Sequence, residues 1–334
     1  MKKSTKRIIA IALAVVMIAG AFAACTAGNN GGTTDSKVYK VGICQLVQHE
    51  ALDAATQGFK DALVATLGEG NVEFDEQNAA GDSATCSTIT NGFVANGVDL
   101  IMANATPALQ AAAQSTTTIP IVATSVTDFG TALGIDDMGA ATGINVTGTA
   151  DLAPLSEQAA MFTELCPDAK TIGILYCSAE ANSVYQAEVI AEELVALGFE
   201  TKSFTAADTN DIATVTKTAC DECDALYIPT DNTMASATAT IEPIVSDANI
   251  PVICGEEGIC KGCGFATLSI SYYSIGYKAG EMAADILQNG TDPATMDVKI
   301  PAREDLVMKY VADRATALGI TVPEGYEAID MTAE

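Results

Sequence analysis

The sequence predicts an α/β fold of two similar halves, each built on a parallel sheet. Short β-type runs alternate with helical patterns, which implies parallel sheets with helices on both faces. This alternation occurs in two similar halves of the chain. About 310 residues follow the N-terminal targeting segment, a length that favours two domains over one.

The N-terminus predicts export. Residues 1–7 are basic and residues 8–24 are continuously apolar or small, which is the pattern of a signal peptide over residues 1–24. Small residues precede Cys25, and a polar tether over 25–37 follows, as in a bacterial lipoprotein signal. We therefore expect an extracytoplasmic protein, lipid-anchored through Cys25 to the outer face of the cell membrane. Cleavage after Ala23 by the ordinary signal peptidase is the alternative, because Phe22 stands where an aliphatic residue is usual.

The first half alternates strands and helices in a regular order. A strand over 37–44 leads into a helix with apolar residues at helical spacing between Leu52 and Leu67. Asp82 is expected to cap the next helix, and Thr106 to open the one after it. The other expected strands of this half lie at residues 71–74, 98–103 and 119–124.

The second half repeats this outline. Its expected strands are residues 170–177, 199–204, 225–229 and 250–254. Its expected helices are residues 181–197, 208–220 and 232–248. The run Gly-Val-Asp-Leu-Ile at 97–101 occupies the same position in the first half as Cys-Asp-Ala-Leu-Tyr at 223–227 in the second. Residues 119–122 correspond in the same way to residues 250–253. A long helix over 271–288 and a strand over 306–309 follow.

The C-terminal part is expected to complete the two lobes, because the chain of a two-lobed binding fold commonly crosses between them more than once. The N-terminal lobe would hold residues 38–147 plus 270–300. The C-terminal lobe would hold 148–269 plus 301–325.

Composition excludes several classes of protein. The net charge of −27 argues against binding to nucleic acid and to anionic lipid surfaces. No segment after the signal is long and apolar enough to span a membrane. The residues bear no dinucleotide fingerprint, no Walker motif and no Gly-x-Ser-x-Gly. His49 and Glu50 are an acid–base pair without a candidate nucleophile, so we expect no enzyme and no cofactor.

Nine cysteines remain after Cys25. The pairs Cys220-x-x-Cys223 and Cys260-x-x-Cys263 are spaced more loosely than a compact zinc ribbon, and His49 is the only histidine. No metal is expected. Structural disulfides and reduced cysteines that pack as small hydrophobic side chains both stay open.

Polar residues follow nearly every expected strand of both halves, where parallel sheets bind ligands. Those expected to bind are Gln48, His49, Glu50, Ala105, Thr106, Ser125, Thr127, Asp128, Glu180, Asn182, Ser183, Thr230, Asp231, Asn232 and Glu256. Helix capping alone explains any one of them. Helix starts at Thr106 and Ser183 suit a carboxylate, and Asp231 suits an ammonium group, so together they describe a site for a zwitterion.

Several of these segments resemble one family. The segments are 41–55, Ala105-Thr106-Pro107, Ser125-Val-Thr-Asp128, Glu180-Ala-Asn-Ser183 and Pro229-Thr-Asp-Asn232. They resemble the ABC-transporter substrate-binding family that includes tryptophan- and tyrosine-binding lipoproteins. The resemblance runs from about residue 38 to 320.

This resemblance implies a type I periplasmic-binding-protein fold: two Rossmann-like lobes with parallel sheets, joined by a three-strand hinge, with a ligand closed between the lobes. It implies an aromatic amino acid, with Thr106, Asn182 and Ser183 near its carboxylate and Asp231 near its amino group. The chain has no Trp, so Tyr272, Tyr273, Phe129 and Tyr185 are the aromatic candidates.

The implied partners are an ABC permease and ATPase complex, for a chain expected to be a monomer. A sensor that signals to a receptor, and a binding protein for a nucleoside or another small metabolite, are the alternatives.

Overall fold

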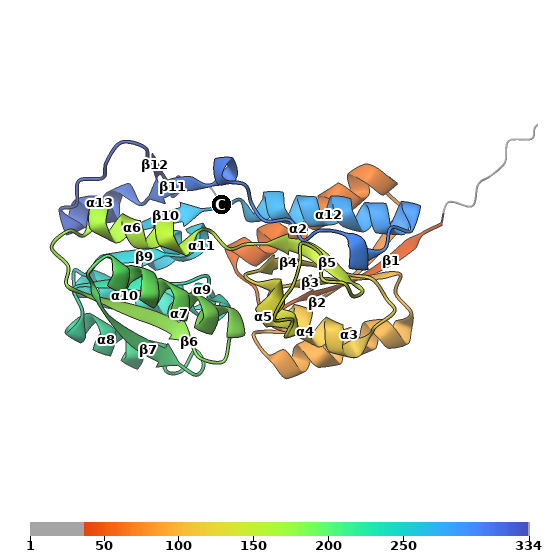
Figure 1. Cartoon of the computed structure of the whole chain (residues 1–334), viewed down its shortest axis with the longest axis horizontal. Helices are drawn as coiled ribbons and strands as arrows, with labels where there is room; N and C mark the ends of the chain where they lie inside the picture. The colour runs from red at the N-terminus through yellow and green to blue at the C-terminus, as the bar shows by residue number, and fades with distance from the viewer. Residues whose placement is uncertain (1–36, 333–334) are drawn as a thin grey trace, which may run out of the picture. The chain divides into compact units, whose positions relative to one another are not determined.

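A computed structural model describes residues 37–332. The predicted signal peptide at 1–24, Cys25 and the tether up to residue 36 lie outside the described residues. The part from Val38 onward is one compact unit that contains two sheets. Each sheet is the centre of an α/β lobe, as predicted (Figure 1).

The first lobe is built on five parallel strands in the order β2-β1-β3-β4-β5. They are β1 (Tyr39–Gln45), β2 (Val72–Asn78), β3 (Leu100–Asn104), β4 (Ile121–Val126) and β5 (Val146–Ala150). Its helices are α2 (Glu50–Leu67), α3 (Ser83–Asn96), α4 (Thr106–Ser115), α5 (Phe129–Leu133) and α12 (Tyr272–Asn289). The side chain of Asp82 accepts the Thr85 N–H at 2.6 Å, so its predicted role as the cap of α3 is confirmed.

The second lobe is built on seven strands in the order β12-β11-β10-β9-β8-β6-β7. They are β6 (Thr171–Cys177), β7 (Glu200–Ala206), β8 (Ala225–Ile228), β9 (Val252–Cys254), β10 (Ala266–Ser269), β11 (Val307–Tyr310) and β12 (Glu327–Ala328). Only the β10–β11 pair is antiparallel. Its helices are α6 (Leu155–Leu165), α7 (Ala181–Ala196), α8 (Ile212–Glu222), α9 (Asn232–Ser236), α10 (Thr238–Asp247), α11 (Glu257–Cys263) and α13 (Ala312–Leu318).

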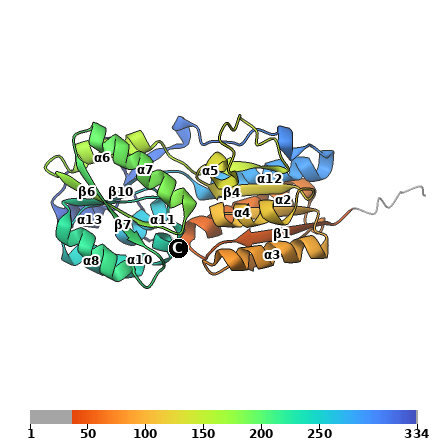
Figure 2. The same cartoon turned by 60° about the horizontal axis from the view of Figure 1, so that its bottom comes forward.

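The two sheets share one topology, which explains the repeated pattern in the sequence. The order β7-β6-β8-β9-β10 of the second sheet repeats β2-β1-β3-β4-β5 of the first. The matched segments therefore fall on equivalent strands, β3 with β8 and β4 with β9. Helices cover both faces of each sheet, so the central strands β3, β4 and β8 are continuous buried runs (Figure 2).

Helix α12 follows the second-lobe strand β10 in the chain but packs beside α2 on the first lobe (Figure 1). Three glycines allow this close approach. A Cβ on Gly276 would lie 2.0 Å from the Ala55 carbonyl oxygen, and one on Gly58 would lie 2.2 Å from the Tyr273 oxygen. The third is Gly280, where a Cβ would lie 2.5 Å from the Phe59 oxygen.

The chain passes between the lobes after β5, after β10 and again after α12. The third passage includes Lys299, which pairs with Thr149 at the end of β5. The end of β5 also lies beside the start of α12, because the Thr149 hydroxyl donates to the Ile275 carbonyl oxygen at 3.2 Å. A hydrogen bond of 2.9 Å from the Tyr272 hydroxyl to Asp151 links two of these passages.

Some elements were not predicted, namely β5, α5, α6, α11, β10, α13 and β12. Strand β5 is short and contains Gly148, at which a Cβ would lie 1.9 Å from the Ala123 oxygen. The predicted helix over 232–248 is divided at Ala237, whose N–H ends α9 by bonding to the Met234 oxygen. Within α10, Pro243 has no N–H to donate to the carbonyl one turn earlier.

The cysteines at described positions are all free thiols. Cys44, Cys177 and Cys254 lie buried on β1, β6 and β9, as the apolar runs around them predict. No three metal-ligating side chains in residues 37–332 are arranged to hold an ion. Over the same range, every helix is too short or too polar to traverse a bilayer.

Candidate functional site

A small buried cavity lies between the two lobes, beyond the carboxyl ends of the strands of both sheets. Its lining combines residues from each lobe and from the passages between them. They are His49, Leu52, Ser125, Thr127, Asp151, Asn182, Thr230, Asp231, Asn232, Ala235, Glu256 and Tyr272. The loops that follow the parallel strands of both lobes thus meet at one site. This is the usual position of a ligand in an open α/β sheet.

Three buried carboxylates dominate this cavity. Asp151, Asp231 and Glu256 are 3 %, 1 % and 2 % exposed. Of the described residues that line the cavity, none is lysine or arginine. Charged carboxylates are costly to bury without a compensating cation, so the cavity favours a positively charged group.

Burial changes the ionisation of these acids. It raises the pKa of Asp151 to about 6 and the pKa of Glu256 to about 7. Burial, assisted by the nearby negative charge of Glu180, also raises the pKa of Asp231 to about 7. Burial lowers the pKa of His49, which favours its neutral form. A cation that enters the cavity would reverse the shifts of the acids by stabilising their charged forms.

Two long helices begin at the cavity without a side-chain cap. Helix α2 starts after His49 and α7 starts after Glu180, and neither residue's side chain caps its own helix. Leu52 in the first turn of α2 and Asn182 in the first turn of α7 both line the cavity. Because helix N-termini carry free N–H groups and partial positive charge, they favour an anionic group on this side of the site.

Two buried polar atoms of the site have no partner. They are the Oγ of Ser125 in the first lobe and the Oδ1 of Asn182 in the second. Ser125 lies where the β4–β5 register shifts, and its φ of 56° is in the left-handed region. Strained backbone of this kind, together with unpaired buried polar atoms, is characteristic of ligand sites.

Contacts across the cleft hold the lobes together around the cavity. The His49 Nε2 atom lies 3.3 Å from the Asn232 Oδ1 atom, and Gln186 Nε2 donates to Thr127 Oγ1 at 3.4 Å. Lys261 of α11 lies 3.1 Å from Glu50 of α2. The cavity has a volume of about 10 Å³, so a ligand larger than about one water molecule enters only when the lobes move apart.

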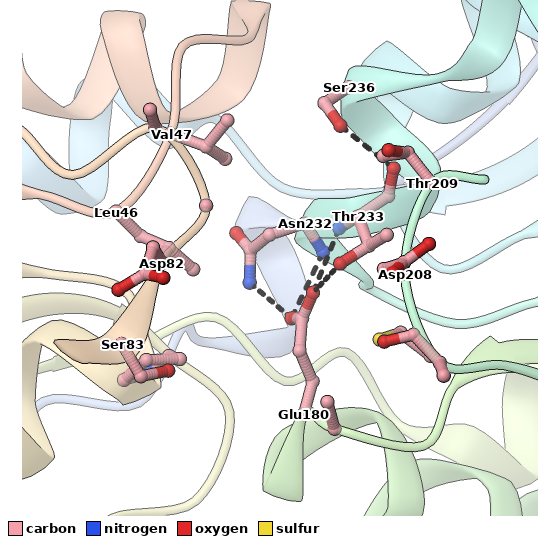
Figure 3. Close-up of a pocket in the computed structure, with 16 residues that line it drawn as sticks. Leu46, Val47, Asp82, Ser83, Glu180, Asp208, Thr209, Asn232, Thr233 and Ser236 are labelled. Atoms are coloured by element: carbon pink, nitrogen blue, oxygen red, sulfur yellow. Dashed lines mark hydrogen bonds between the residues drawn. The ribbon is translucent and has the colours of Figure 1, made fainter. Parts of the chain in front are cut away.

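A larger hollow of about 240 Å³ opens beside the cavity and shares Asn232 with it. Figure 3 shows Leu46, Val47, Asp82 and Ser83 on one side of this hollow. Glu180 lies on the other side, where its carboxylate accepts the N–H groups of Asn232 and Thr233 at 3.2 and 2.8 Å. Glu180 therefore holds the start of α9, and its oxygens are already occupied by protein donors.

The predicted site residues fall into two sets. Those that line the cavity are His49, Ser125, Thr127, Asn182, Thr230, Asp231, Asn232, Glu256 and Tyr272. The others lie outside its lining: Gln48, Glu50, Ala105, Thr106, Asp128, Glu180 and Ser183. Among these, Gln48 and Glu50 are exposed, and Asp128 caps α5 by accepting the Thr131 N–H at 2.6 Å.

The three acids that line the cavity also accept hydrogen bonds from other groups of the protein. Asp231 caps α9 by accepting the Met234 N–H at 2.8 Å, and Glu256 caps α11 by accepting the N–H groups of Gly258 and Ile259, both at 2.5 Å. Asp151 instead accepts hydroxyls, from Tyr272 at 2.9 Å and Thr127 at 3.2 Å.

Sequence reasoning missed three lining residues, Leu52, Asp151 and Ala235. Asp151 comes directly after β5, so the rule that polar residues after strands face the site would have found it. The strand itself was not recognised. Among the predicted aromatic candidates only Tyr272 lines the cavity, whereas Phe129 is buried in the first-lobe core and Tyr273 bonds outward to Asp61.

Comparisons with known proteins agree on one family. Residues 40–329 match the family model of ABC transporter substrate binding proteins. The chain is 35% identical over 292 residues to a tyrosine-binding protein of Clostridioides difficile, covering 86% of this chain and 84% of the relative.

Solved structures with similar folds include two of comparable identity. One is an ABC domain from Streptococcus pneumoniae in complex with L-Trp, with a TM-score of 0.83, 31% identity, and coverage of 88% of this chain and 100% of that one. The other is the ligand-free, open structure of a substrate binding protein with adhesive properties from Clostridium difficile. Its TM-score is 0.67, at 34% identity and coverage of 88% and 100%.

Proposed function

The chain belongs to the ABC transporter substrate binding proteins, and on that premise we propose that it captures an aromatic amino acid for an importer. Proteins of this family bind solutes outside the cytoplasm and are not enzymes. One observation carries the choice of an amino acid. The cavity between the lobes combines three buried carboxylates with two uncapped helix N-termini.

A zwitterion matches this arrangement of charge. Its ammonium group compensates the buried carboxylates, and its carboxylate accepts N–H groups at the starts of α2 and α7. A neutral sugar would leave the acids without a cation. The C. difficile relative is named for tyrosine and the S. pneumoniae structure contains L-Trp, which supports an aromatic side chain.

The arrangement of the lobes also supports ligand capture by closure. At similar coverage and identity, the present structure is closer to the L-Trp complex than to the ligand-free, open relative. Lobe closure around a ligand is the usual hinge response of a two-lobed binding protein. The proposed ligand contacts lie among the predicted residues of both lobes that line the cavity, together with Asp151.

Calorimetry tests the ligand class. Tyrosine, tryptophan and phenylalanine are expected to bind, and at least one is expected to bind tightly. Their decarboxylated and N-acetylated analogues should bind at least about 30-fold more weakly, because each loses one buried charge contact. Tight binding of a neutral sugar or nucleoside, with no response to amino acids, would contradict the proposal.

The proposed anchor is a lipid on Cys25. The intact mass of protein extracted from membranes is expected to correspond to a chain that begins at Cys25 and carries acyl groups, because two or more chains anchor stably. The C25A variant should be released into the medium. An unlipidated chain that begins at Ala24 would show ordinary signal cleavage instead.

A further inference from the structure

The three buried carboxylates of the cavity differ in what already compensates their charge. Asp231 accepts the Cys177 N–H at 2.6 Å as well as the Met234 N–H, and it sits at the start of α9. Glu256 sits in the same way at the start of α11. Backbone N–H groups therefore use both oxygens of each acid. Their charges also face the positive ends of helices.

Asp151 lacks this compensation. It follows β5, where no helix begins, and the partners of its carboxylate from other residues are the neutral hydroxyls of Tyr272 and Thr127. A carboxylate offers about four lone-pair positions, so both oxygens can accept a further donor. Of the three acids, only Asp151 accepts no backbone N–H from another residue, so its oxygens are the most open to a donor from the ligand.

Two unpartnered acceptors line the same cavity as Asp151. The amide of Asn182 is oriented by its Nδ2, which donates to the Thr230 carbonyl oxygen at 3.1 Å. This leaves the Asn182 Oδ1 atom, an acceptor only, without a donor. The Ser125 Oγ atom is likewise unpartnered, and both side chains are 5% exposed.

We propose that Asp151 binds the primary ammonium group of the ligand, with Ser125 Oγ and Asn182 Oδ1 as the other two acceptors. This deepens the proposed function and rests on it. A primary ammonium has three N–H donors, and the three acceptors come from the first lobe, the second lobe and the passage between them. The ammonium thereby joins both lobes at the hinge. Asp231 and Glu256 act mainly by holding α9 and α11 in place.

The test compares L-tyrosine with desaminotyrosine, which differ in the ammonium group alone. Calorimetry on the full exported chain gives the ratio of the two dissociation constants. The wild-type protein should prefer tyrosine by at least about 30-fold, since a buried charge contact is at stake. The D151N variant should reduce this preference to less than about threefold, with desaminotyrosine affinity unchanged or improved.

Matched variants separate the role of Asp151 from the roles of the other two acids. D231N and E256Q, which remove the charges of the two acids that cap helices, should change the affinities for both ligands alike, so the preference for tyrosine persists. S125A should weaken the binding of tyrosine by about five- to tenfold through the loss of one hydrogen bond, without affecting the binding of desaminotyrosine. This variant keeps the proposal testable if D151N does not fold.

The outcomes distinguish the two levels of the proposal. A preference that persists in D151N, or one that disappears in D231N instead, overturns the role of Asp151 while leaving amino-acid binding in place. If the wild-type protein binds tyrosine no better than desaminotyrosine, the role of Asp151 is also overturned, while amino-acid binding stays in place. If folded wild-type protein binds none of tyrosine, tryptophan and phenylalanine, the proposed function itself fails, and the role of Asp151 fails with it.

Discussion

Replacing Gly276 by alanine is expected to lower the free energy of unfolding by about 3 kcal/mol or more, the upper range for an overpacked core. The new Cβ would lie 2.0 Å from the Ala55 oxygen and 2.7 Å from the Ala55 carbonyl carbon and Cα. These are backbone atoms of α2 and cannot rotate away. Relief therefore requires α12 to move off α2.

Gly92 provides the matched control. It lies inside α3, and a Cβ there would meet nothing within 4 Å. G92A should stabilise the protein by about 0.5–1 kcal/mol, because alanine is the better helix former. Urea denaturation followed by circular dichroism measures both variants. Equal effects of G276A and G92A would show that the helices do not pack as closely as the structure places them.

The G276A substitution is also expected to change the ligand site. Helix α12 begins at Tyr272, whose hydroxyl bonds Asp151 in the cavity wall. Displacing α12 therefore moves a cavity residue as well as a packing interface, and G276A is expected to weaken tyrosine binding under conditions where the protein is still folded.

Much of the fold was predictable because the sheets are parallel except at the β10–β11 pair, and their central strands are buried on both faces. Strands of this kind read as short apolar runs, and the helices between them have clear starts such as Asp82 and Thr106. The prediction failed where close backbone packing required a residue that is atypical of the element. Strand β5 carries Gly148 because the β4 backbone lies too close for a side chain, and glycine is atypical of strands.

The candidate site was predictable in position but less so in the role of each residue. Residues at or after the carboxyl ends of parallel strands do gather in one cavity, as His49, Ser125 and Asn182 show. However, helix caps and anion or cation ligands are chosen from the same small set of polar residues. Asp128 caps α5 away from the cavity, whereas Asp231 caps α9 and also lines it. Only the three-dimensional partners distinguish these roles.

Ligand affinity is expected to fall as the pH is lowered from 8 to 5. Asp151 must be ionised to bind an ammonium group, and burial raises its pKa to about 6 in the absence of a bound cation. At pH 5 about one molecule in eleven has this group ionised, so tyrosine affinity should fall by about tenfold from this acid alone.

The stability of the unliganded protein should respond to these acids in the opposite direction. A carboxyl group whose pKa is raised by folding contributes stability below its unfolded pKa, about 4, and loses that contribution as the pH rises through 6 to 7. Acidification from pH 7.5 to 5 should therefore stabilise the unliganded protein through these groups while it weakens tyrosine binding. His49 opposes this, because its lowered pKa makes its burial costly once the pH falls below about 6.5.

Calorimetry across this pH range, in buffers of different ionisation enthalpy, gives both the affinity and the protons released on binding. The charged groups around the cavity are Asp151, Asp231, Glu256, His49 and Glu180, with Glu50, Glu257, Lys261 and Lys309 at its outer edge. Proton release per bound tyrosine should rise as the pH falls from 8, to about half a proton from Asp151 at pH 6 and more at pH 5. It should be smaller in D151N, because the ammonium group then has no titrating partner there. Desaminotyrosine, which lacks the ammonium group, should release fewer protons. An affinity for tyrosine that does not change between pH 8 and 5 would mean that the buried acids do not face the ligand's charge.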